Sequence, residues 1–186
     1  MSNPKRLGVV LALALVAALG VATGTANATE TPSSAGVMAV GSRLINGDGD
    51  TSGKCLEISN GGRGEGARVQ MAGCHTNAHQ SWYFTPVGNS WFMIRSHDAD
   101  AAGRCLTALP KGIPAAMFTC DGGNDQLWWF GRPASPGWFQ MENYVWEGTI
   151  PLCLDVENNG LSNEVSVWNC GPSNKGNQLW RWASVG

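Results

Sequence analysis

A threefold internal repeat constrains the fold of this chain more than any other feature of its sequence. Each repeat opens with a Cys-Leu pair, contains a second Cys, and ends in a Gln-x-Trp run followed by two further residues. The Cys-Leu pairs begin at Cys55, Cys105 and Cys153, the second cysteines are Cys74, Cys120 and Cys170, and the Gln-x-Trp runs cover 80–84, 126–130 and 178–182. Three matches in the same order indicate one supersecondary unit that is used three times.

The Gln-x-Trp runs alternate in a way that is typical of β-strands. The Trp and the last aromatic residue lie two positions apart, so they share one face of a strand while the residue between them faces away. The inner positions are always aromatic, and they are Trp82 and Phe84, Trp128 and Phe130, and Trp180 and Trp182. Turn signals such as Asn-Gly and Asp-Gly separate the apolar runs, and no amphipathic helix is expected after residue 28. The sequence therefore predicts an all-β protein of short strands with these aromatic residues in one core.

The repeat also indicates how the six cysteines pair. Sequence alone does not normally choose among the connectivities that six cysteines allow. A bond from the first to the second Cys inside each repeat preserves the threefold order, whereas bonds between repeats would break it. We therefore expect the disulfides Cys55–Cys74, Cys105–Cys120 and Cys153–Cys170.

The first 28 residues have the features of a secretory signal peptide. A basic start is followed by a nearly continuous apolar run over 7–22 and by the small residues of a cleavage site at 26–28. A membrane anchor is disfavoured, because the apolar run is shorter than the ~20 residues of a spanning helix. We expect a signal peptide over 1–28, a disordered leader rich in Thr, Ser and Pro over 29–37, and a secreted, extracellular protein.

The charge balance limits the class of partner. The chain carries 12 basic and 14 acidic residues and has no basic run. Nucleic-acid binding depends on many phosphate contacts from basic side chains, so neither nucleic acid nor an anionic membrane surface is expected as a partner. A neutral ligand is compatible with this composition.

Three Cys-Leu … Cys … Gln-x-Trp repeats after a signal peptide resemble the ricin B-type lectin domains, which also occur as carbohydrate-binding modules on secreted glycosidases. The resemblance covers residues 38–186, with repeats at about 38–85, 86–132 and 133–186. One Gln-x-Trp is a weak signal, but three in register with paired cysteines are specific. The family implies a β-trefoil, in which six strands form a barrel and three hairpins cap it. We expect a monomer whose partners are glycans or a polysaccharide.

The third repeat fills every binding position that the resemblance implies. A pyranose needs a carboxylate for its neighbouring hydroxyls, an aromatic plane beneath its C–H patch, and an amide. In these lectins, the acid after Cys-Leu grips vicinal hydroxyls, the aromatic residue two positions before the second Cys is the stacking platform, and the Asn before Gln-x-Trp is a further ligand. Those positions are held here by Asp155, Trp168 and Asn177, while Gln178 is expected to buttress the acid and its hairpin. Each residue taken singly also fits an ordinary turn or packing role, so the hypothesis depends on their combined spacing.

The other two repeats depart from this pattern. In the first, Glu57 replaces the Asp and Ala72 stands at the platform position, so the loss of the ring predicts that this pocket does not bind. In the second, Phe118 could stack on a sugar, but Thr107 cannot grip two hydroxyls as a carboxylate does. Asp125 replaces the Asn and is an alternative position for the acid. Thr107, Phe118 and Asp125 are therefore candidates for a weaker second pocket.

We predict a non-catalytic domain that binds a galactose-like or xylan-type sugar mainly through the third repeat, without a metal or cofactor. The sequence contains no Gly-x-Ser-x-Gly, no His-Glu-x-x-His and no Gly-rich phosphate loop, and its histidines have no metal spacing with the cysteines. The run 48–53 starts like an EF-hand loop but has Ser at the twelfth position. Tyr83, Trp129 and Trp146 are candidates for exposed aromatic residues, which can bind ligands. The alternative is a protein-binding β-trefoil, such as a protease inhibitor or toxin-associated module, because the fold does not decide the function.

Overall fold

The computed structural model describes residues 41–51, 53–59 and 64–184, without the side chains of 132–135. The expected signal peptide over 1–28 and leader over 29–37 lie outside the described residues. The described chain forms strands joined by turns and short 3-10 helices. Within it, no helix is long and apolar enough to cross a membrane.

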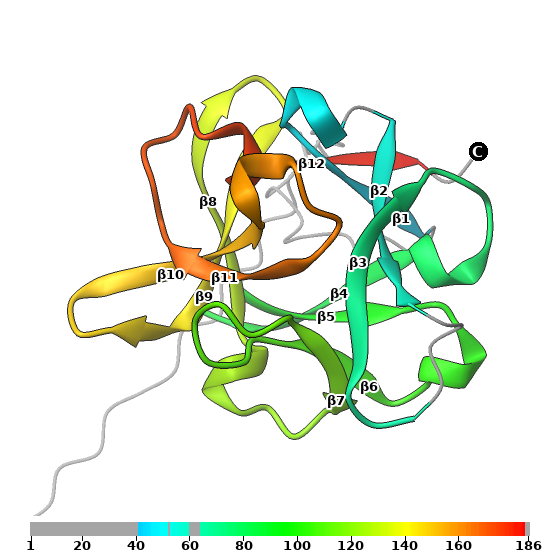
Figure 1. Cartoon of the computed structure of the whole chain (residues 1–186). Coiled ribbons are helices and arrows are strands. Elements are labelled where there is room, and N and C mark those ends of the chain that lie inside the picture. Colours follow the sequence, from blue (N-terminus) through cyan, green and yellow to red (C-terminus); the bar gives the residue numbers. More distant parts are fainter. Residues whose placement is uncertain (1–40, 52, 60–63, 185–186) are drawn as a thin grey trace, which may run out of the picture. The chain divides into compact units, whose positions relative to one another are not determined.

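Each third of the described chain contributes four strands and one or more 3-10 helices (Figure 1). The strands are β1 (Ser42–Asn46), β2 (Lys54–Ile58), β3 (Ala67–Gly73), β4 (Trp82–Gly88), β5 (Trp91–Ser96), β6 (Arg104–Thr107), β7 (Ala116–Thr119), β8 (Trp128–Ser135), β9 (Trp138–Glu147), β10 (Ile150–Val156), β11 (Val165–Asn169) and β12 (Leu179–Ser184). The 3-10 helices are η1 (Gly49–Thr51), η3 (Ala78–Gln80), η4 (Ala99–Ala101), η5 (Asn124–Gln126), η6 (Asn158–Gly160) and η7 (Gly176–Gln178).

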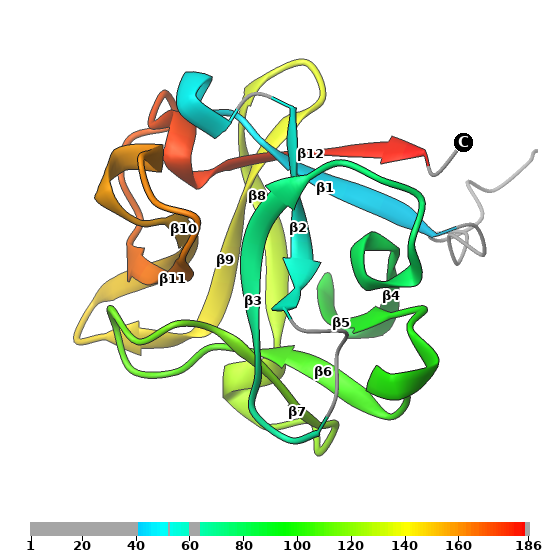
Figure 2. The same ribbon diagram turned by 45° about the vertical axis from the view of Figure 1, so that its right-hand side comes forward.

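The first and last strands of each third close into a barrel. Pairing runs from β1 to β4, β5, β8, β9 and β12 and returns to β1, and every pair is antiparallel. The remaining strands form three hairpins, β2–β3, β6–β7 and β10–β11. A six-stranded barrel with three hairpins is a β-trefoil, so the predicted fold class is confirmed. Figure 2 shows how β12 lies beside β1 to complete the ring.

The Trp of each Gln-x-Trp run lies at the centre of its third of the core. Trp82, Trp128 and Trp180 have no exposed surface. Because a buried indole N–H needs an acceptor, each donates to the backbone carbonyl of the Leu in the Cys-Leu pair of its own repeat. The donors Trp82, Trp128 and Trp180 reach Leu56, Leu106 and Leu154 at 3.0, 2.9 and 3.0 Å. The same bond therefore fastens the barrel to the hairpin in all three repeats.

The last aromatic residues of the three runs meet one another inside the barrel. Ring centroids lie 5.1 Å apart for Phe84 and Phe130, 4.2 Å for Phe84 and Trp182, and 5.2 Å for Phe130 and Trp182, all in edge-to-face arrangement. Such pairs contribute about 0.5–1.5 kcal/mol beyond the burial of their surface. The alternation in the sequence thus predicted the common aromatic core correctly.

The three predicted disulfides are present. Cys55–Cys74, Cys105–Cys120 and Cys153–Cys170 join positions 19, 15 and 17 residues apart. In the chain-entropy model, closing a loop of this size stabilises the fold by ~3 kcal/mol. Each bond ties the two strands of one hairpin together.

The Gln of each run fixes the strand that carries the second Cys. Its Nε2 donates to the carbonyl of the residue before this Cys, and its Oε1 accepts from the N–H of the residue after it. All three Gln side chains are buried, so their amides are held in fixed positions. The residues that hold these bonds are Gln80, Gln126 and Gln178.

Candidate functional site

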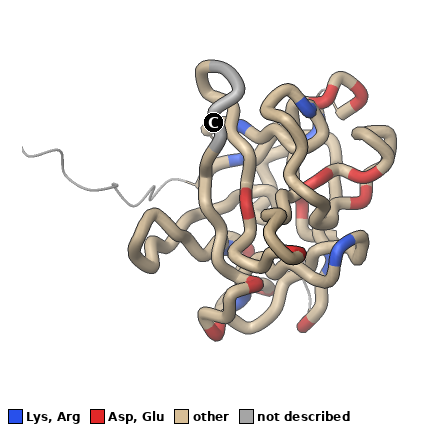
Figure 3. The backbone as a smooth tube through the Cα atoms, turned by 90° about the vertical axis from the view of Figure 1, so that its left-hand side faces the viewer, with Lys and Arg blue, Asp and Glu red and all other residues tan. Residues whose placement is uncertain are grey.

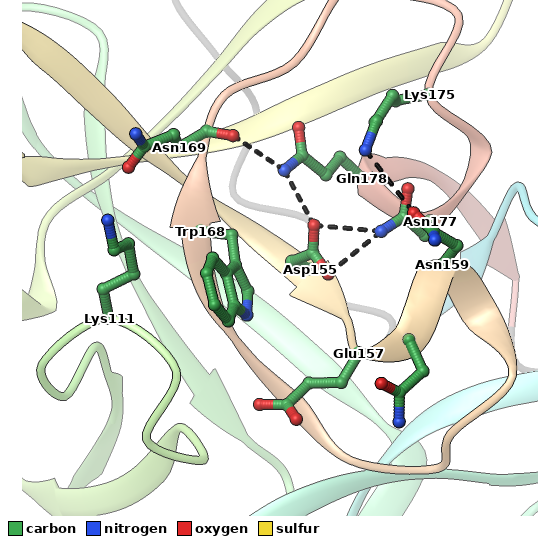
Figure 4. A pocket seen from close by; sticks show the side chains of 10 residues that line it. Lys111, Asp155, Glu157, Asn159, Trp168, Asn169, Lys175, Asn177 and Gln178 are labelled. Carbon is green, nitrogen blue, oxygen red and sulfur yellow. Dashed lines mark hydrogen bonds between the residues drawn. The ribbon is translucent and has the colours of Figure 1, made fainter.

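Asp155 and Trp168 lie on the two paired strands of the third hairpin. Cys153 is the register partner of Trp168, and Asp155 is the partner of Ser166, so Asp155 and Trp168 are diagonal neighbours across β10 and β11. Asn177 and Gln178, from η7, lie beside the carboxylate (Figure 4). All four predicted residues line one surface pocket of about 340 Å³.

The carboxylate of Asp155 is held by two side-chain amides. Asn177 Nδ2 donates to both carboxylate oxygens at 3.0 Å, and Gln178 Nε2 donates to Oδ2 at 2.7 Å. Gln178 thus makes the contacts of the buttress that the sequence predicts. Asn177 supports the carboxylate in the same way, because its Nδ2 donates to Asp155 and, at 3.2 Å, to the carbonyl of Val156. Its Oδ1 is the atom that this side chain can offer to a ligand.

Burial raises the pKa of Asp155 to about 6, while hydrogen bonds from Gln178 and Asn177 and the charge of Lys175 act in the opposite direction. Only 5% of Asp155 is exposed, so its charged form loses much of its hydration. A group with this pKa is ionised at neutral pH and becomes protonated in mildly acidic solution. At neutral pH the pocket therefore contains a fixed anionic acceptor.

The indole of Trp168 remains 43% exposed, as a stacking platform requires. It is supported by the loop between β6 and β7, which belongs to the second repeat. Gly112 N–H donates to the carbonyl of Val167 at 3.1 Å, and Lys111 Nζ lies 5.8 Å from the ring centroid of Trp168. The pocket of the third repeat is thus completed by a segment of the second.

The rim of this pocket is polar. Beyond the predicted residues, it is lined by Lys111, Glu157, Asn158, Asn159, Asn169 and Lys175. Asn158 and Asn159 both have positive φ, of 54° and 56°, which Asn tolerates better than most residues do. Lys175 Nζ donates to Asn159 Oδ1 at 3.5 Å across the opening (Figure 4). The Asn-Asn-Gly turn signal marked one side of this rim in the sequence, whereas nothing marked Lys111.

Thr107, Phe118 and Asp125, the candidates for a weaker second pocket, also lie together. They line a hollow of about 310 Å³. Thr107 is buried and its Oγ1 donates to the carbonyl of Cys105 at 3.0 Å, so it is engaged within its own strand. The structure thus brings these residues together but leaves Asp125 as the acid among them.

Besides Asp125, this hollow is lined by Asp121 and by Glu65, which reaches it from the first repeat. Its carboxylate accepts hydrogen bonds from the hydroxyl and, at 3.0 Å, from the N–H of Thr119. These bonds, rather than the nearby Arg104, are the main reason that the pKa of Glu65 is lowered. Sequence reasoning missed Glu65, because it lies in a loop far from the second repeat's motif.

Glu65 and Lys111 occupy equivalent places in successive repeats. Each precedes a glycine of positive φ, 77° at Gly66 and 78° at Gly112. Gly66 N–H donates at 2.9 Å to the residue before Phe118, just as Gly112 N–H donates to the residue before Trp168. The hairpin loop of one repeat therefore completes the pocket of the next.

The motif positions of the first repeat make other contacts than those of the third. Ala72 is the register partner of Cys55, the place that Trp168 holds opposite Cys153. The carboxylate of Glu57 is engaged by Gln80 Nε2 at 2.9 Å and by the ring of His75 at 2.6 Å. His79, which replaces the Asn, instead contacts Asp98. That this repeat does not bind sugar stays a prediction.

Basic residues are scattered over the side of the molecule that carries the third hairpin. Figure 3 shows Lys and Arg as separate short stretches of the described backbone. In the same part of the chain, no group of three or more His, Cys, Asp or Glu residues is placed to hold a metal ion. The groups that line the third-repeat pocket are carboxylates, side-chain amides, an aromatic plane and the amines of Lys111 and Lys175.

The trefoil barrel and the hydrogen bonds that recur in each repeat accompany a match to one protein family. A family model described as "Ricin-type beta-trefoil lectin domain" matches residues 44–136, half of the chain. The chain is a member of this family of non-catalytic domains. The matched residues end before the third hairpin, and no curated protein matches the chain in sequence.

Solved structures with the same fold are similar to the chain at low sequence identity. A designed threefold symmetric protein, ThreeFoil, is 21% identical with a TM-score of 0.64, over 77% of this chain and 97% of that one. An exo-β-1,3-galactanase from Clostridium thermocellum is 21% identical with a TM-score of 0.64, over 78% and 30%. The β-trefoil lectin of the Vibrio vulnificus hemolysin/cytolysin, with N-acetyl-D-lactosamine bound, is 22% identical with a TM-score of 0.55, over 78% and 94%. At these identities the likeness shows the fold alone.

Proposed function

We propose that this chain is a carbohydrate-binding protein without catalytic activity, which binds a neutral sugar mainly through the pocket of the third repeat. One observation carries the proposal. The ionised carboxylate of Asp155 and the exposed indole of Trp168 lie on adjacent strands and line the same hollow. A carboxylate beside an exposed aromatic plane matches a pyranose, which has hydroxyls at its edge and C–H groups on one face.

The mode of binding follows from these contacts. The oxygens of Asp155 accept hydrogen bonds from two neighbouring hydroxyls while the C–H face of the ring packs on Trp168. Gln178 and Asn177 keep the carboxylate in place, and Asn177 Oδ1 accepts a hydrogen bond from a further hydroxyl. Because a monosaccharide occupies only this one open pocket, we expect a dissociation constant on the order of 0.1–1 mM. Clustered ligands would raise the avidity.

Galactose-like sugars and xylan-type chains are the ligand classes that we propose. Two structural relatives support the first: one is named as an exo-β-1,3-galactanase, and the other contains N-acetyl-D-lactosamine. Isothermal titration with methyl β-galactoside, N-acetyllactosamine and xylo-oligosaccharides would distinguish the two classes.

The test compares two variants in the third-repeat pocket with one variant in the second repeat. Asp155→Ala and Trp168→Ala should each abolish retention on a galactose or xylan resin while the circular dichroism spectrum stays unchanged. Phe118→Ala, at the platform position of the second repeat, should retain binding. If both third-repeat variants bound like the wild type, the assigned pocket would be wrong. If the wild-type protein bound nothing on a glycan array, a protein-binding role would replace the proposal.

Secretion is part of the proposal. The three disulfides support it, because such bonds form and persist in oxidising compartments. Expression in the native host should place the protein in the culture medium as a monomer beginning at Thr29. Amino-terminal sequencing and sedimentation velocity would check both statements.

A further inference from the structure

A largely apolar groove lies beside the third-repeat pocket. It has a volume of about 480 Å³ and is bordered by the β6–β7 loop and by the end of the β9–β10 hairpin. Lys111 lines both the groove and the third-repeat pocket, and Leu109 and Asp125 line both the groove and the second-repeat hollow. The groove is therefore a neighbour of both the third-repeat pocket and the second-repeat hollow.

Trp146 forms part of the wall of this groove. It lies on β9 opposite Pro151, near the tip of the hairpin, and its side chain is 51% exposed. The neighbouring Glu147 forms an ion pair with Lys111, which connects the hairpin to the loop that supports Trp168. The hairpin extends away from the barrel in Figure 1. An exposed indole thus lies next to the proposed sugar pocket.

The other two aromatic candidates from the sequence do not line this groove. Tyr83 is half-buried and packs against the ring of His97, with centroids 4.7 Å apart. Trp129 is also half-buried. Of the three, Trp146 alone combines high exposure with a place in a depression.

We propose that the third-repeat pocket binds one sugar residue of a saccharide chain and that the groove binds the sugar residues next to it, with Trp146 as a second stacking platform. This inference rests on the proposed function. A linear glycan presents C–H faces and hydroxyl edges in alternation. The groove offers the matching surface, because an exposed indole and aliphatic side chains are flanked by polar groups on Lys111, Glu147 and Asp125. The ligand class is therefore an oligosaccharide or polysaccharide that is bound along its length.

The polar groups of the groove suit a ligand rich in hydroxyls. Lys111, Asp125 and Glu147 border the apolar surface and offer hydrogen-bond donors and acceptors along it. Hydroxyl groups of a sugar can hydrogen-bond to these side chains without requiring them to leave water completely. The groove and the third-repeat pocket share Lys111 as a lining residue, and this proximity favours one extended ligand over two separate ones.

The experiment measures the dependence of affinity on chain length by isothermal titration calorimetry. The probes are two series, from one to four units, of β-linked galactose and of β-linked xylose. For the full-length wild-type protein, the dissociation constant in one series should fall about tenfold from one unit to four, which corresponds to about 1.4 kcal/mol. In Trp146→Ala this ratio should fall to about one, and Trp146→Phe should restore part of it. Leu161→Ala, an exposed apolar residue outside the groove, should behave like the wild type.

The possible outcomes separate this inference from the proposed function. If the wild type binds sugars but its affinity does not depend on chain length, or if Trp146→Ala keeps the wild-type ratio, the inference is wrong and the proposed function stands. If the wild type binds neither series, both are wrong. If sedimentation shows that the wild type self-associates, that Trp146→Ala does not, and that chain length has no effect, the groove is an interface between copies and the inference is overturned.

Discussion

Gly112 lies against the indole of Trp168, although the two residues belong to different repeats. A Cβ on Gly112 would lie 3.3 Å from Cζ2 of Trp168, which is closer than most such contacts allow. Gly112 also has φ of 78°, in the left-handed region that favours glycine. The stacking platform of the third repeat therefore depends on a backbone conformation in the second.

We expect Gly112→Ala to weaken sugar binding, because the added methyl group displaces the indole of Trp168. The left-handed φ should also cost about 1 kcal/mol of unfolding free energy. Gly66→Ala is a matched control, since Gly66 has φ of 77° and faces Phe118. It should lose similar stability in urea but keep its affinity in titration calorimetry. Equal affinity in Gly112→Ala and the wild type would show that the platform does not depend on this contact.

We expect sugar affinity to fall as the pH decreases through about 6, because burial raises the pKa of Asp155 to that value and only the carboxylate accepts two hydroxyl hydrogen bonds. Well below this pH, affinity should decrease about tenfold per pH unit. Titration calorimetry between pH 4.5 and 8 would measure the profile. Asp155→Asn should bind weakly and without this dependence. A flat wild-type profile would count against the role of Asp155.

The carboxyl group of Asp155 should also make the unliganded protein less stable as the pH rises. The pKa of Asp155 is about 6 in the folded protein against an ordinary value of 3.8, so the folded state holds the proton more tightly than the unfolded state does. Its contribution to the unfolding free energy is therefore fully present below pH 3.8 and is lost as the pH rises through about 6, a change of about 3 kcal/mol. Urea unfolding of the wild type and Asp155→Asn at several pH values would show it as a changing difference. A constant difference would contradict the prediction.

Removal of the third disulfide should affect both stability and binding. The double variant Cys153→Ala/Cys170→Ala should lose ~3 kcal/mol of unfolding free energy. It should also bind sugar more weakly, because the bond fixes the strands that carry Asp155 and Trp168. The double variant Cys55→Ala/Cys74→Ala, in the first hairpin, should lose comparable stability while retaining affinity. Equal affinities in the two variants would argue against a special role of the third hairpin.

The features that sequence reasoning predicted correctly are local patterns that occur three times. The two-residue alternation of Trp82 and Phe84 and its two copies predicted the core, and the order of the cysteines predicted their pairing. The candidate residues of the third repeat also came together, because Asp155 and Trp168 lie on one hairpin and Gln178 is fixed to that hairpin by hydrogen bonds. The binding role of these residues stays a prediction.

What the sequence did not reveal comes from contacts between repeats. Lys111 and Gly112 support a platform more than fifty positions along the chain, and Glu65 reaches Thr119 across a similar separation. No periodicity encodes these contacts, because they depend on how one hairpin loop leans against the next hairpin. The groove beside Trp146 escaped notice for the same reason. The equivalent glycines, Gly66 and Gly112, were the nearest signal, although their spacing from the cysteines is not constant.

The pairing of β1 with β12 has a consequence for the order of the repeats. Ser42 and Ser184 are register partners at one end of this pair, so a short peptide could join them without disturbing the barrel. New termini opened in the turn at 89–90, between β4 and β5, would yield a circular permutant with the same strand pairings. In such a permutant the third hairpin would lie in the middle of the polypeptide, and its pocket would still receive Lys111 from the repeat that packs against it.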